Sequence, residues 1–401
     1  MEISPYFDEM SIPLSTILRL EPLKADPNYS LVIICKDTRA VRVEFDAAGS
    51  FTSTFLDVLS SHAFPGAVAQ TFAFFNKQHF PQPRFPLSGG MDWWTLYSAQ
   101  EEFSRQGVIP SDLWYLYNDN YSTVDTYPRD FILPSQFSMS DVGEVAKFRS
   151  KGRIPALTYR NYRNGAVLCR SAQPLVGVLR HRSQADKFLL NLFRLRGDVN
   201  DRSEIDSPSD FYVFDCRKPI AATANSALGK GVEDEKAYEH AKVIFLDIEN
   251  IHTMRSCCRA LEEALSTVGY GGTQLDSASA SNTADSDSRF MSRIEETEWL
   301  VHIRKILQAS LQVAEKLELE RASVLVHCSD GWDRTAQVCA TTQVLLDPFF
   351  RTLKGLAVLV EKDWCSFGYK FQDRMGHAES TADSQERSPV FLQVWVSVCV
   401  L

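Results

Sequence analysis

The apolar and polar positions near the start of the chain predict two strands and a helix. Residues 31–34 read Leu-Val-Ile-Ile, an apolar run typical of a buried strand. In residues 41–45 apolar side chains alternate with Arg and Glu, which predicts a half-buried strand. Ser50 is then a candidate helix cap, followed by apolar residues on one helical face as far as Leu59. So small a group of elements indicates the end of a domain rather than a whole one.

A Pro- and Gly-rich stretch separates this region from the rest of the chain. Residues 62–91 are rich in Pro, Gly and Phe and end on a Gly-Gly pair, which is typical of a linker. We therefore expect residues 1–61 to form one module and residues 92–401 to form a larger domain. Within that domain, residues 272–289 contain almost no large apolar side chains, which predicts a disordered surface loop.

Helical spacing returns after this polar stretch and leads into a short strand. Apolar residues recur at helical spacing between Trp299 and Ala314, which predicts a helix packed on the core. Residues 324–326, Val-Leu-Val, predict a short buried strand, and the apolar positions from Thr335 onward predict another helix. Residues 328–334 therefore form a loop between a strand and the N-terminus of a helix.

The loop carries the residue spacing of a cysteine-dependent phosphatase. It reads His-Cys-Ser-Asp-Gly-Trp-Asp-Arg-Thr over residues 327–335. A helix N-terminus lowers the pKa of a cysteine thiol from its usual value of about 8.5, and its backbone N–H groups bind a phosphate dianion. Arg334, six residues after Cys328, is suited to grip two phosphate oxygens. Gly331 gives the tight loop its backbone freedom.

Proton transfer requires one more group in this loop. Asp333 is the candidate general acid for the leaving alkoxide and later the base that activates water, and Asp330 is the competing candidate. Thr335 is suited to donate a hydrogen bond to the cysteine sulfur, whereas Trp332 is as well suited to packing as to substrate contact. Cys-x5-Arg alone is a weak pattern. The strand before it and the helix after it make a buried structural thiol the less favoured interpretation of Cys328.

Composition narrows the functional classes. The chain carries 42 Lys and Arg against 51 Asp and Glu, a net charge of −9, which argues against nucleic acid as a partner. No apolar run reaches the roughly 18 residues that span a bilayer, and the acidic N-terminus does not begin like a signal peptide. The nine cysteines include no Cys-x-x-Cys pair, so no metal or other cofactor is expected. Scattered cysteines indicate reduced thiols in the cytoplasm.

Residues 324–337, VLVHCSDGWDRTAQ, resemble the signature of the myotubularin lipid phosphatases. Further segments that resemble the family are 126–128, 133–134, 148–155, 169–177, 214–217, 247–252, 351–355, 361–364 and 388–393. The resemblance covers residues 92–393, with weaker likeness before. It implies an α/β fold, with a tyrosine-phosphatase-like large domain built on a central sheet with flanking helices, preceded by a PH-type module called GRAM. Because family members begin earlier and continue further, we expect a partial PH-GRAM module and a C-terminally truncated phosphatase domain.

The resemblance also implies roles for the residues that match the family's pocket. Cys328 is implied as the nucleophile, Asp333 as the acid and Arg334 as the arginine that binds the transferred phosphate. The implied substrate-binding residues are Ser329, Asp330, Gly331, Trp332, Asn225, Asn250, Ile251, Lys370 and Arg374. Position 370 is lysine where the family has arginine, and lysine keeps the charge but loses the fork.

Plainer roles stay open for the residues outside the loop. Lys370 and Arg374 are spaced as a solvated pair on a helix face would be. Asn225 and Asn250 are of a residue type that caps helices and forms turns.

The family acts on the 3-phosphate of phosphatidylinositol 3-phosphate and phosphatidylinositol 3,5-bisphosphate, and the resemblance implies the same reaction here through a phosphocysteine intermediate. It further implies phosphoinositide lipids at membrane surfaces as partners, homo- or hetero-oligomers with family relatives, and a cytoplasmic protein peripheral on endosomal membranes. Two alternatives stay open. One is a protein tyrosine or dual-specificity phosphatase, and the other is a non-catalytic phosphoinositide-binding adaptor, which the short ends favour. The intact Cys328, Asp333 and Arg334 favour an active enzyme.

Overall fold

A computed structural model describes most of the chain. The described residues are 12–25, 28–35, 40–45, 50–64, 96–197, 210–224, 229–238, 240–269, 283–376 and 385–400. They divide into two compact units. Unit 1 comprises residues 1–86, 256–298 and 371–387, and unit 2 comprises residues 87–255, 299–370 and 388–401. Because each unit combines separate stretches of chain, the predicted domain boundaries at 61 and 92 stay a prediction. The predicted linker lies outside the described residues from residue 65 onward.

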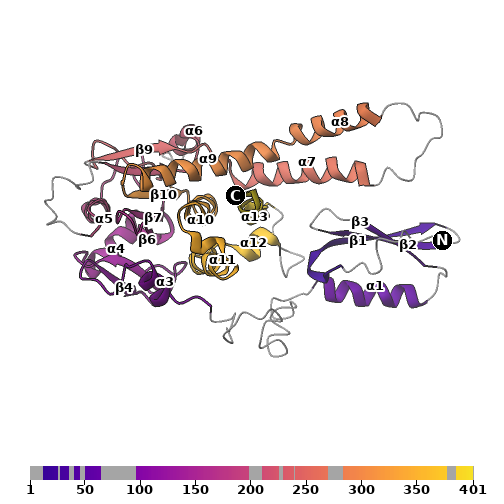
Figure 1. Cartoon of the computed structure of the whole chain (residues 1–401), viewed down its shortest axis with the longest axis horizontal. Coiled ribbons are helices and arrows are strands. Elements are labelled where there is room, and N and C mark those ends of the chain that lie inside the picture. Colours follow the sequence, from indigo (N-terminus) through magenta and orange to yellow (C-terminus); the bar gives the residue numbers. More distant parts are fainter. Residues whose placement is uncertain are drawn as a thin grey trace. The chain divides into compact units, whose positions relative to one another are not determined.

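Unit 1 contains a three-stranded antiparallel sheet with a helix beside it (Figure 1). Its elements are a 3-10 turn (Leu14–Thr16), β1 (Ile17–Ala25), β2 (Asn28–Cys35), β3 (Ala40–Phe45) and α1 (Ser50–Ala63). Leu31 and Ile33 of β2 are buried in a cluster with Ile17 and half-buried residues of α1. Strands β2 and β3 and helix α1 confirm the prediction for residues 31–60. Strand β1 was not predicted because Pro22 and several charged residues interrupt its apolar pattern.

Two long helices, most of whose residues belong to unit 1, come much later in the sequence. They are α7 (Ile251–Gly269) and α8 (Thr283–Glu296). The prediction of a disordered loop over residues 272–289 is wrong where α8 begins at Thr283, and residues 270–282 lie outside the described part of the chain. The start of α8 is rich in Asp, Ser and Thr, which gives little apolar signal, although acidic residues favour a helix N-terminus.

Unit 2 is a mixed α/β structure built on one seven-stranded sheet. The strands are β4 (Trp114–Asn118), β5 (Asp130–Pro134), β6 (Ala156–Arg160), β7 (Val167–Ala172), β8 (Phe211–Asp215), β9 (Ala241–Phe245) and β10 (Val324–Cys328). Their order is β4-β5-β6-β7-β10-β8-β9. Pairs from β4 to β7 are antiparallel, whereas β7, β10, β8 and β9 run parallel. The predicted strand at residues 324–326 is thus the centre of the parallel half, buried along its whole length.

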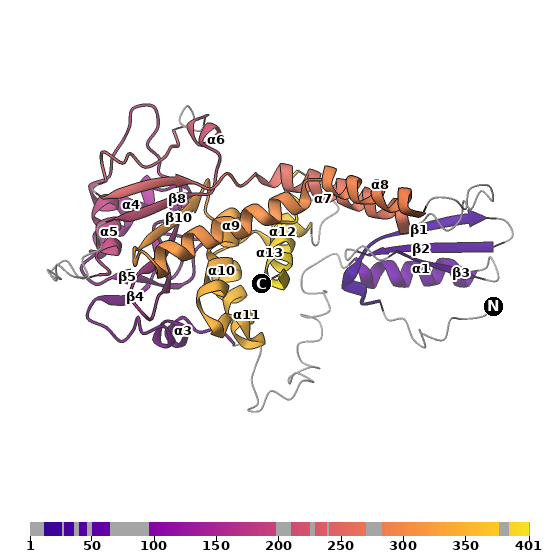
Figure 2. The same ribbon diagram turned by 45° about the horizontal axis from the view of Figure 1, so that its top comes forward.

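Helices flank this sheet, with α4 and α5 on one side and α9 and α10 on the other (Figures 1 and 2). The α-helices of unit 2 with bounds not yet given are α3 (Ala99–Arg105), α4 (Met139–Phe148), α5 (Gln184–Arg194), α6 (Pro219–Ala224), α9 (Trp299–Glu318), α10 (Arg334–Leu346), α11 (Leu353–Val360) and α13 (Val390–Val400). Short 3-10 turns cover Ser150–Gly152 and Pro348–Arg351, a π-helix covers Glu361–Ser366, and α12 (Phe371–Met375) belongs to unit 1. Helices α9 and α10 confirm the helices predicted on either side of β10.

The apolar end of the chain is part of the fold. Helix α13 packs against α9 and α10, and the Gln337 side chain of α10 donates hydrogen bonds to Gln393 and to the Val390 carbonyl at 2.9 and 3.0 Å. None of the helices in the described part of the chain is long and apolar enough to cross a membrane.

Candidate active site

The loop from Cys328 to Asp333 leaves the sheet between its two parallel neighbours. In β10, Cys328 is paired with Ala172 of β7, and His327 is paired with Asp215 of β8. Helix α10 begins directly after the loop, at Arg334. The sequence explains this strand-loop-helix geometry, because an apolar run long enough for one buried strand is followed by a glycine-containing turn and then by a helical pattern. Cys328 is 3% exposed and lies next to the N-terminus of α10, where backbone N–H groups favour an anion.

Gly331 determines the shape of the loop. Its φ is +78°, a conformation that side chains with a Cβ disfavour, and a Cβ at this position would overlap the Ser171 carbonyl of β7. The N–H of Gly331 donates to the Cys328 sulfur at 3.3 Å. Its carbonyl accepts hydrogen bonds from Arg170 at 2.9 Å and from Arg153 at 3.1 Å. Both polar ends of this residue are therefore hydrogen-bonded, the N–H to the Cys328 sulfur and the carbonyl to two arginines.

The two arginines that hold the Gly331 carbonyl differ in their electrostatic surroundings. Arg170 forms an ion pair with Asp363 at 2.8 Å. Arg153 is 0% exposed, and its other hydrogen bonds go to Thr126 and to the Phe367 carbonyl. Among the described residues, Arg153 forms no ion pair with a carboxylate. No partner carboxylate among the described residues therefore neutralises the charge of Arg153, and this charge acts on the loop.

Burial opposes this charge, and it lowers the pKa of Arg153 to about 10, while the nearby Cys328 and Asp330 favour the charged form. The guanidinium stays protonated at neutral pH. Its charge then favours an anion in the loop, which is either the thiolate or a bound phosphate.

A buried charge network lies behind the strand end. His327 is fully buried, and its Nε2 lies 3.0 Å from the Glu233 carboxylate. Glu233 also accepts a hydrogen bond from Arg149 at 2.6 Å, and Arg149 forms a two-pronged pair with Asp186 at 2.7 Å. Burial opposes the charge of His327, but Glu233 outweighs burial and raises the pKa of His327. Burial likewise opposes the charge of Glu233, but His327 and Arg149 hold its pKa well below the usual range.

The predicted catalytic residues come together in the structure. Arg334 is half-buried, and its guanidinium donates to the Ser329 hydroxyl at 3.4 Å and to the Ile248 carbonyl at 3.3 Å, so it lies back along the loop. Asp333 is 8% exposed at the cap position of α10, but its side chain forms no capping hydrogen bond. Asp330 instead accepts a hydrogen bond from Ser150 at 2.9 Å. This contact ties the competing carboxylate to Ser150 at the loop's edge, and the choice of Asp333 as the acid stays a prediction.

Trp332 packs against two cations. Its ring lies 5.4 Å from the Arg153 guanidinium and 4.9 Å from the Lys370 ammonium. The structure thus brings Lys370 beside the loop, directly before α12 rather than on a helix face. Arg374 lies in α12 of unit 1, where it is 5% exposed and paired with Glu386 at 2.7 Å. Its contact with a second phosphate stays a prediction.

Of the other predicted pocket residues, one is outside the described residues. Asn225 directly follows the end of α6 at Ala224, and nothing of its structure is described. Asn250 caps α7, because its side-chain oxygen accepts the N–H groups of His252 and Thr253 at 2.9 and 3.1 Å. The carbonyl of Ile251 accepts a hydrogen bond from Ser388 at 2.9 Å. Asn250 therefore has the helix-capping role that its residue type suggested. Substrate contact by Asn225, Asn250 and Ile251 stays a prediction.

Sequence reasoning missed several residues that hold the loop. Arg153, Arg170 and Glu233 act from distant segments. The one local signal was Arg170, a cation inside the otherwise apolar strand β7. Thr335 differs from expectation, because its buried hydroxyl has no hydrogen-bond partner among the described residues and so does not donate to the sulfur here. No group of His, Cys, Asp or Glu in the described part of the chain could hold a metal ion.

Comparison with known proteins gives one family. The family model described as "Myotubularin-like phosphatase domain" matches residues 71–400. Myotubularin from Rattus norvegicus is 37% identical over 400 residues, covering 98% of this chain and 60% of the relative. Myotubularin from Xenopus tropicalis is 36% identical over 391 residues, covering 96% of the chain and 59% of the relative. Phosphatidylinositol-3,5-bisphosphate 3-phosphatase MTMR2 from Bos taurus is 36% identical over 410 residues, covering 98% and 57%. The chain spans about three-fifths of the length of these curated relatives.

Replacing Arg153 by methionine tests the electrostatic role of that residue. We expect alkylation of Cys328 by iodoacetamide at pH 7 to slow about tenfold, because a buried positive charge that favours an anion in the loop is removed. Mass spectrometry of the Cys328 peptide separates its alkylation from that of the other thiols. Arg153→Lys keeps the charge and serves as the control. An unchanged alkylation rate in a folded Arg153→Met protein would contradict this role.

Replacing Glu233 by glutamine tests the buried network. At neutral pH the free energy of unfolding should fall by about 3–5 kcal/mol, since Arg149 and His327 lose a buried partner. The loss should shrink below about pH 4.3, where the lowered pKa of Glu233 means that the wild type itself loses this stabilisation. It should also shrink as pH rises through the raised pKa of His327, since that contribution is complete only below about 6.5. Urea unfolding of both proteins across this pH range measures the acidic and the basic dependence. A difference in unfolding free energy that does not change with pH would contradict the charged state of Glu233 and His327.

Proposed function

Because the chain belongs to the family of myotubularin-like phosphatases, we propose that it hydrolyses the 3-phosphate of phosphatidylinositol 3-phosphate and phosphatidylinositol 3,5-bisphosphate. The observation that carries the proposal is the buried Cys328 at the N-terminus of α10, with Arg334 lying back along the same loop. The name of the Bos taurus relative gives the second of these lipids as its substrate. Lys370 beside Trp332 supplies a further cation for a polyphosphorylated ring.

The reaction proceeds in two balanced steps. The Cys328 thiolate attacks phosphorus, the bond from phosphorus to the inositol oxygen breaks, and Asp333 gives its proton to the departing alkoxide. Water then attacks the phosphocysteine, its proton passes to the Asp333 carboxylate, and inorganic phosphate leaves with the thiolate restored. Arg334 and the loop N–H groups hold the three phosphoryl oxygens throughout. Arg153 adds a fixed positive charge behind the Gly331 carbonyl, which costs no reorganisation during the reaction.

The proposal extends to the surroundings of the catalytic loop. Unit 2 is then a tyrosine-phosphatase-like domain, and the sheet of β1–β3 with α1 is part of a PH-GRAM module. The enzyme works in the cytoplasm, peripheral on endosomal membranes, because its substrates are membrane lipids. It assembles with copies of itself or with family relatives. Supporting features are the parallel strands around β10 and the strand-loop-helix order of residues 324–346.

A substrate panel tests the proposed reaction. We expect phosphate release from both 3-phosphorylated lipids, little release from a phosphotyrosine peptide, and a loss of about a thousandfold or more in Cys328→Ser. Equal turnover of the peptide and the lipids would instead indicate a protein phosphatase. Lipid binding without release from any substrate would indicate an adaptor. Retention of fold in Cys328→Ser is checked by its unfolding curve.

Replacing Asp333 by alanine tests the acid. Turnover of lipid should fall by about 10²–10⁴-fold, because an inositol alkoxide needs a proton to leave. The first-turnover release of phenolate from an aryl phosphate should fall much less, since a phenolate leaves without a proton and this step precedes the attack of water. Asp330→Ala is the matched control in the same loop, and it should not separate the two substrates. If Asp333→Ala slows both substrates alike, Asp333 is not the acid.

A further inference from the structure

Three of the most exposed large apolar side chains in the described residues lie in segments that follow the parallel strands of the sheet that carries the catalytic loop. Strands β7, β10 and β8 run parallel, so the segments that follow them leave the sheet at one edge. Leu179 and Val178 follow β7 and are 81% and 75% exposed, and Ile220 follows β8 and is 84% exposed. Ile220 and Leu179 have the highest exposed fractions of any large apolar residue in the described part of the chain. Contiguous exposed apolar groups are usual at interaction sites.

Val178 and Leu179 lie on a turn whose backbone is hydrogen-bonded. The N–H of Arg180 donates to the Gly177 carbonyl at 3.3 Å, and the N–H of His181 donates to the Val176 carbonyl at 2.8 Å. Gly177 in turn donates to the Lys230 carbonyl at 3.2 Å, which ties the turn to the segment after β8. The backbone of the turn is therefore hydrogen-bonded at its base, whereas the side chains of Val178 and Leu179 at its tip are exposed.

The turn is also tied directly to the catalytic loop. The N–H of Gln173 donates to the Ser329 carbonyl at 3.1 Å. Arg217 after β8 bonds the Gln173 side chain, and it donates to the Gly231 carbonyl at 2.9 Å. Val178 lies five residues after Gln173, a stretch that spans at most about 18 Å. Because Gln173 bonds the residue that follows Cys328, the apolar tip is anchored to the same edge of the sheet as the catalytic loop.

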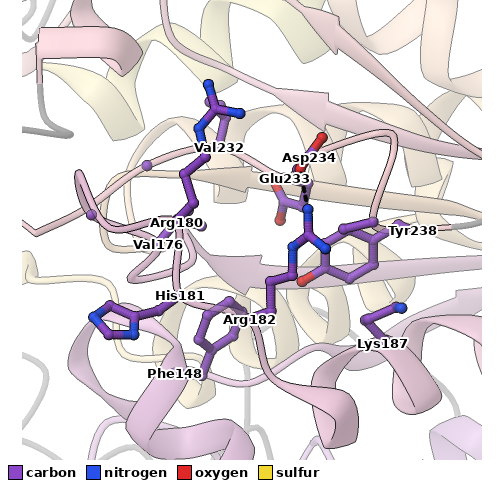
Figure 3. Close-up of a pocket in the computed structure, with 13 residues that line it drawn as sticks. Phe148, Val176, Arg180, His181, Arg182, Lys187, Val232, Glu233, Asp234 and Tyr238 are labelled. Atoms are coloured by element: carbon purple, nitrogen blue, oxygen red, sulfur yellow. Dashed lines mark hydrogen bonds and ion pairs between the residues drawn. The ribbon is translucent and has the colours of Figure 1, made fainter.

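Basic side chains follow this apolar tip in the sequence. Arg180, His181 and Arg182 follow it directly and are exposed, and Lys187 joins them around a cavity of about 270 Å³ (Figure 3). The figure shows Arg182 directed toward Asp234, with which it pairs at 2.9 Å, while Arg180 and His181 point elsewhere. The other carboxylate of the cavity, Glu233, already bonds Arg149 and His327. The turn therefore presents an apolar tip on a mainly cationic base.

We propose that the turn of residues 177–182 docks the enzyme on anionic membranes: Val178 and Leu179 enter the bilayer interface, and Arg180 binds lipid headgroups. This inference rests on the proposed function and names the surface through which the same site meets its lipid. Apolar side chains flanked by cations are the pattern that binds an anionic bilayer interface. A tip of two or three side chains is small against the roughly 800 Å² per partner of a stable protein interface, which favours the bilayer.

Vesicle binding by the full chain carrying Cys328→Ser tests the proposal without turnover. The probes are vesicles of phosphatidylcholine, with and without phosphatidylserine, and neither contains a substrate. Val178→Ser with Leu179→Ser should weaken binding roughly tenfold or more. Arg180→Ser should weaken binding about fivefold, only where phosphatidylserine is present.

The chain offers matched controls at the opposite edge of the sheet. Leu319 is 74% exposed just before β10, and Arg163 is exposed just before β7. Leu319→Ser and Arg163→Ser should leave vesicle binding unchanged. Unchanged binding in the Val178, Leu179 double variant, or an equal loss in Leu319→Ser, would overturn the proposal.

A second measurement uses the active chain. The Val178, Leu179 double variant should keep its turnover of a short-chain, water-soluble phosphatidylinositol 3-phosphate and lose about tenfold in turnover of the same headgroup in vesicles. An equal loss on both substrates would place the defect in the catalytic loop and overturn docking. Because the binding assay needs neither substrate nor turnover, its outcome is independent of whether the proposed reaction is correct.

Discussion

The structure around the catalytic loop depends on the hydrogen bonds of one residue, Gly331. Its N–H points at the Cys328 sulfur, and its carbonyl is held by two buried arginines. Only glycine fits, because φ is positive and the Ser171 carbonyl occupies the place of a Cβ. Its N–H therefore turns toward the Cys328 sulfur, and its carbonyl turns away from it. An anion-binding loop requires that polarity.

This arrangement places charged side chains in the protein interior, where other residues of unit 2 supply partners of opposite charge. Arg149 is paired with Asp186 and Glu233, Arg170 with Asp363, and Arg217 with Asp215. These pairs join the end of α4 to α5 and to Glu233, and β7 to the π-helix of residues 361–366, so the scaffold is fixed by satisfied ion pairs as well as by apolar packing. Arg153 differs from the other three because it bonds only neutral oxygens. The network therefore leaves one positive charge for the loop.

Local patterns in the sequence predicted the elements that carry the chemistry. The apolar run of β10, the glycine of the loop and the helical run of α10 are adjacent in the chain, so each could be read from its own residues. Helix α8 escaped prediction because its first residues are polar. Arg153 and Glu233 escaped because their roles depend on partners more than 90 residues away, Gly331 and His327 respectively. The capping role of Asn250 shows that a residue type compatible with a pocket is equally compatible with a helix end.

We propose that Cys328 forms the covalent intermediate in a loop organised by Gly331. Rapid quenching of Asp333→Ala during turnover of an aryl phosphate, followed by mass spectrometry of the loop peptide, shows whether it does. Without Asp333 the second step slows, because no carboxylate activates water, so phosphate should accumulate on the Cys328 sulfur. Turnover with no phosphate on Cys328, or with phosphate on another residue, would contradict the account.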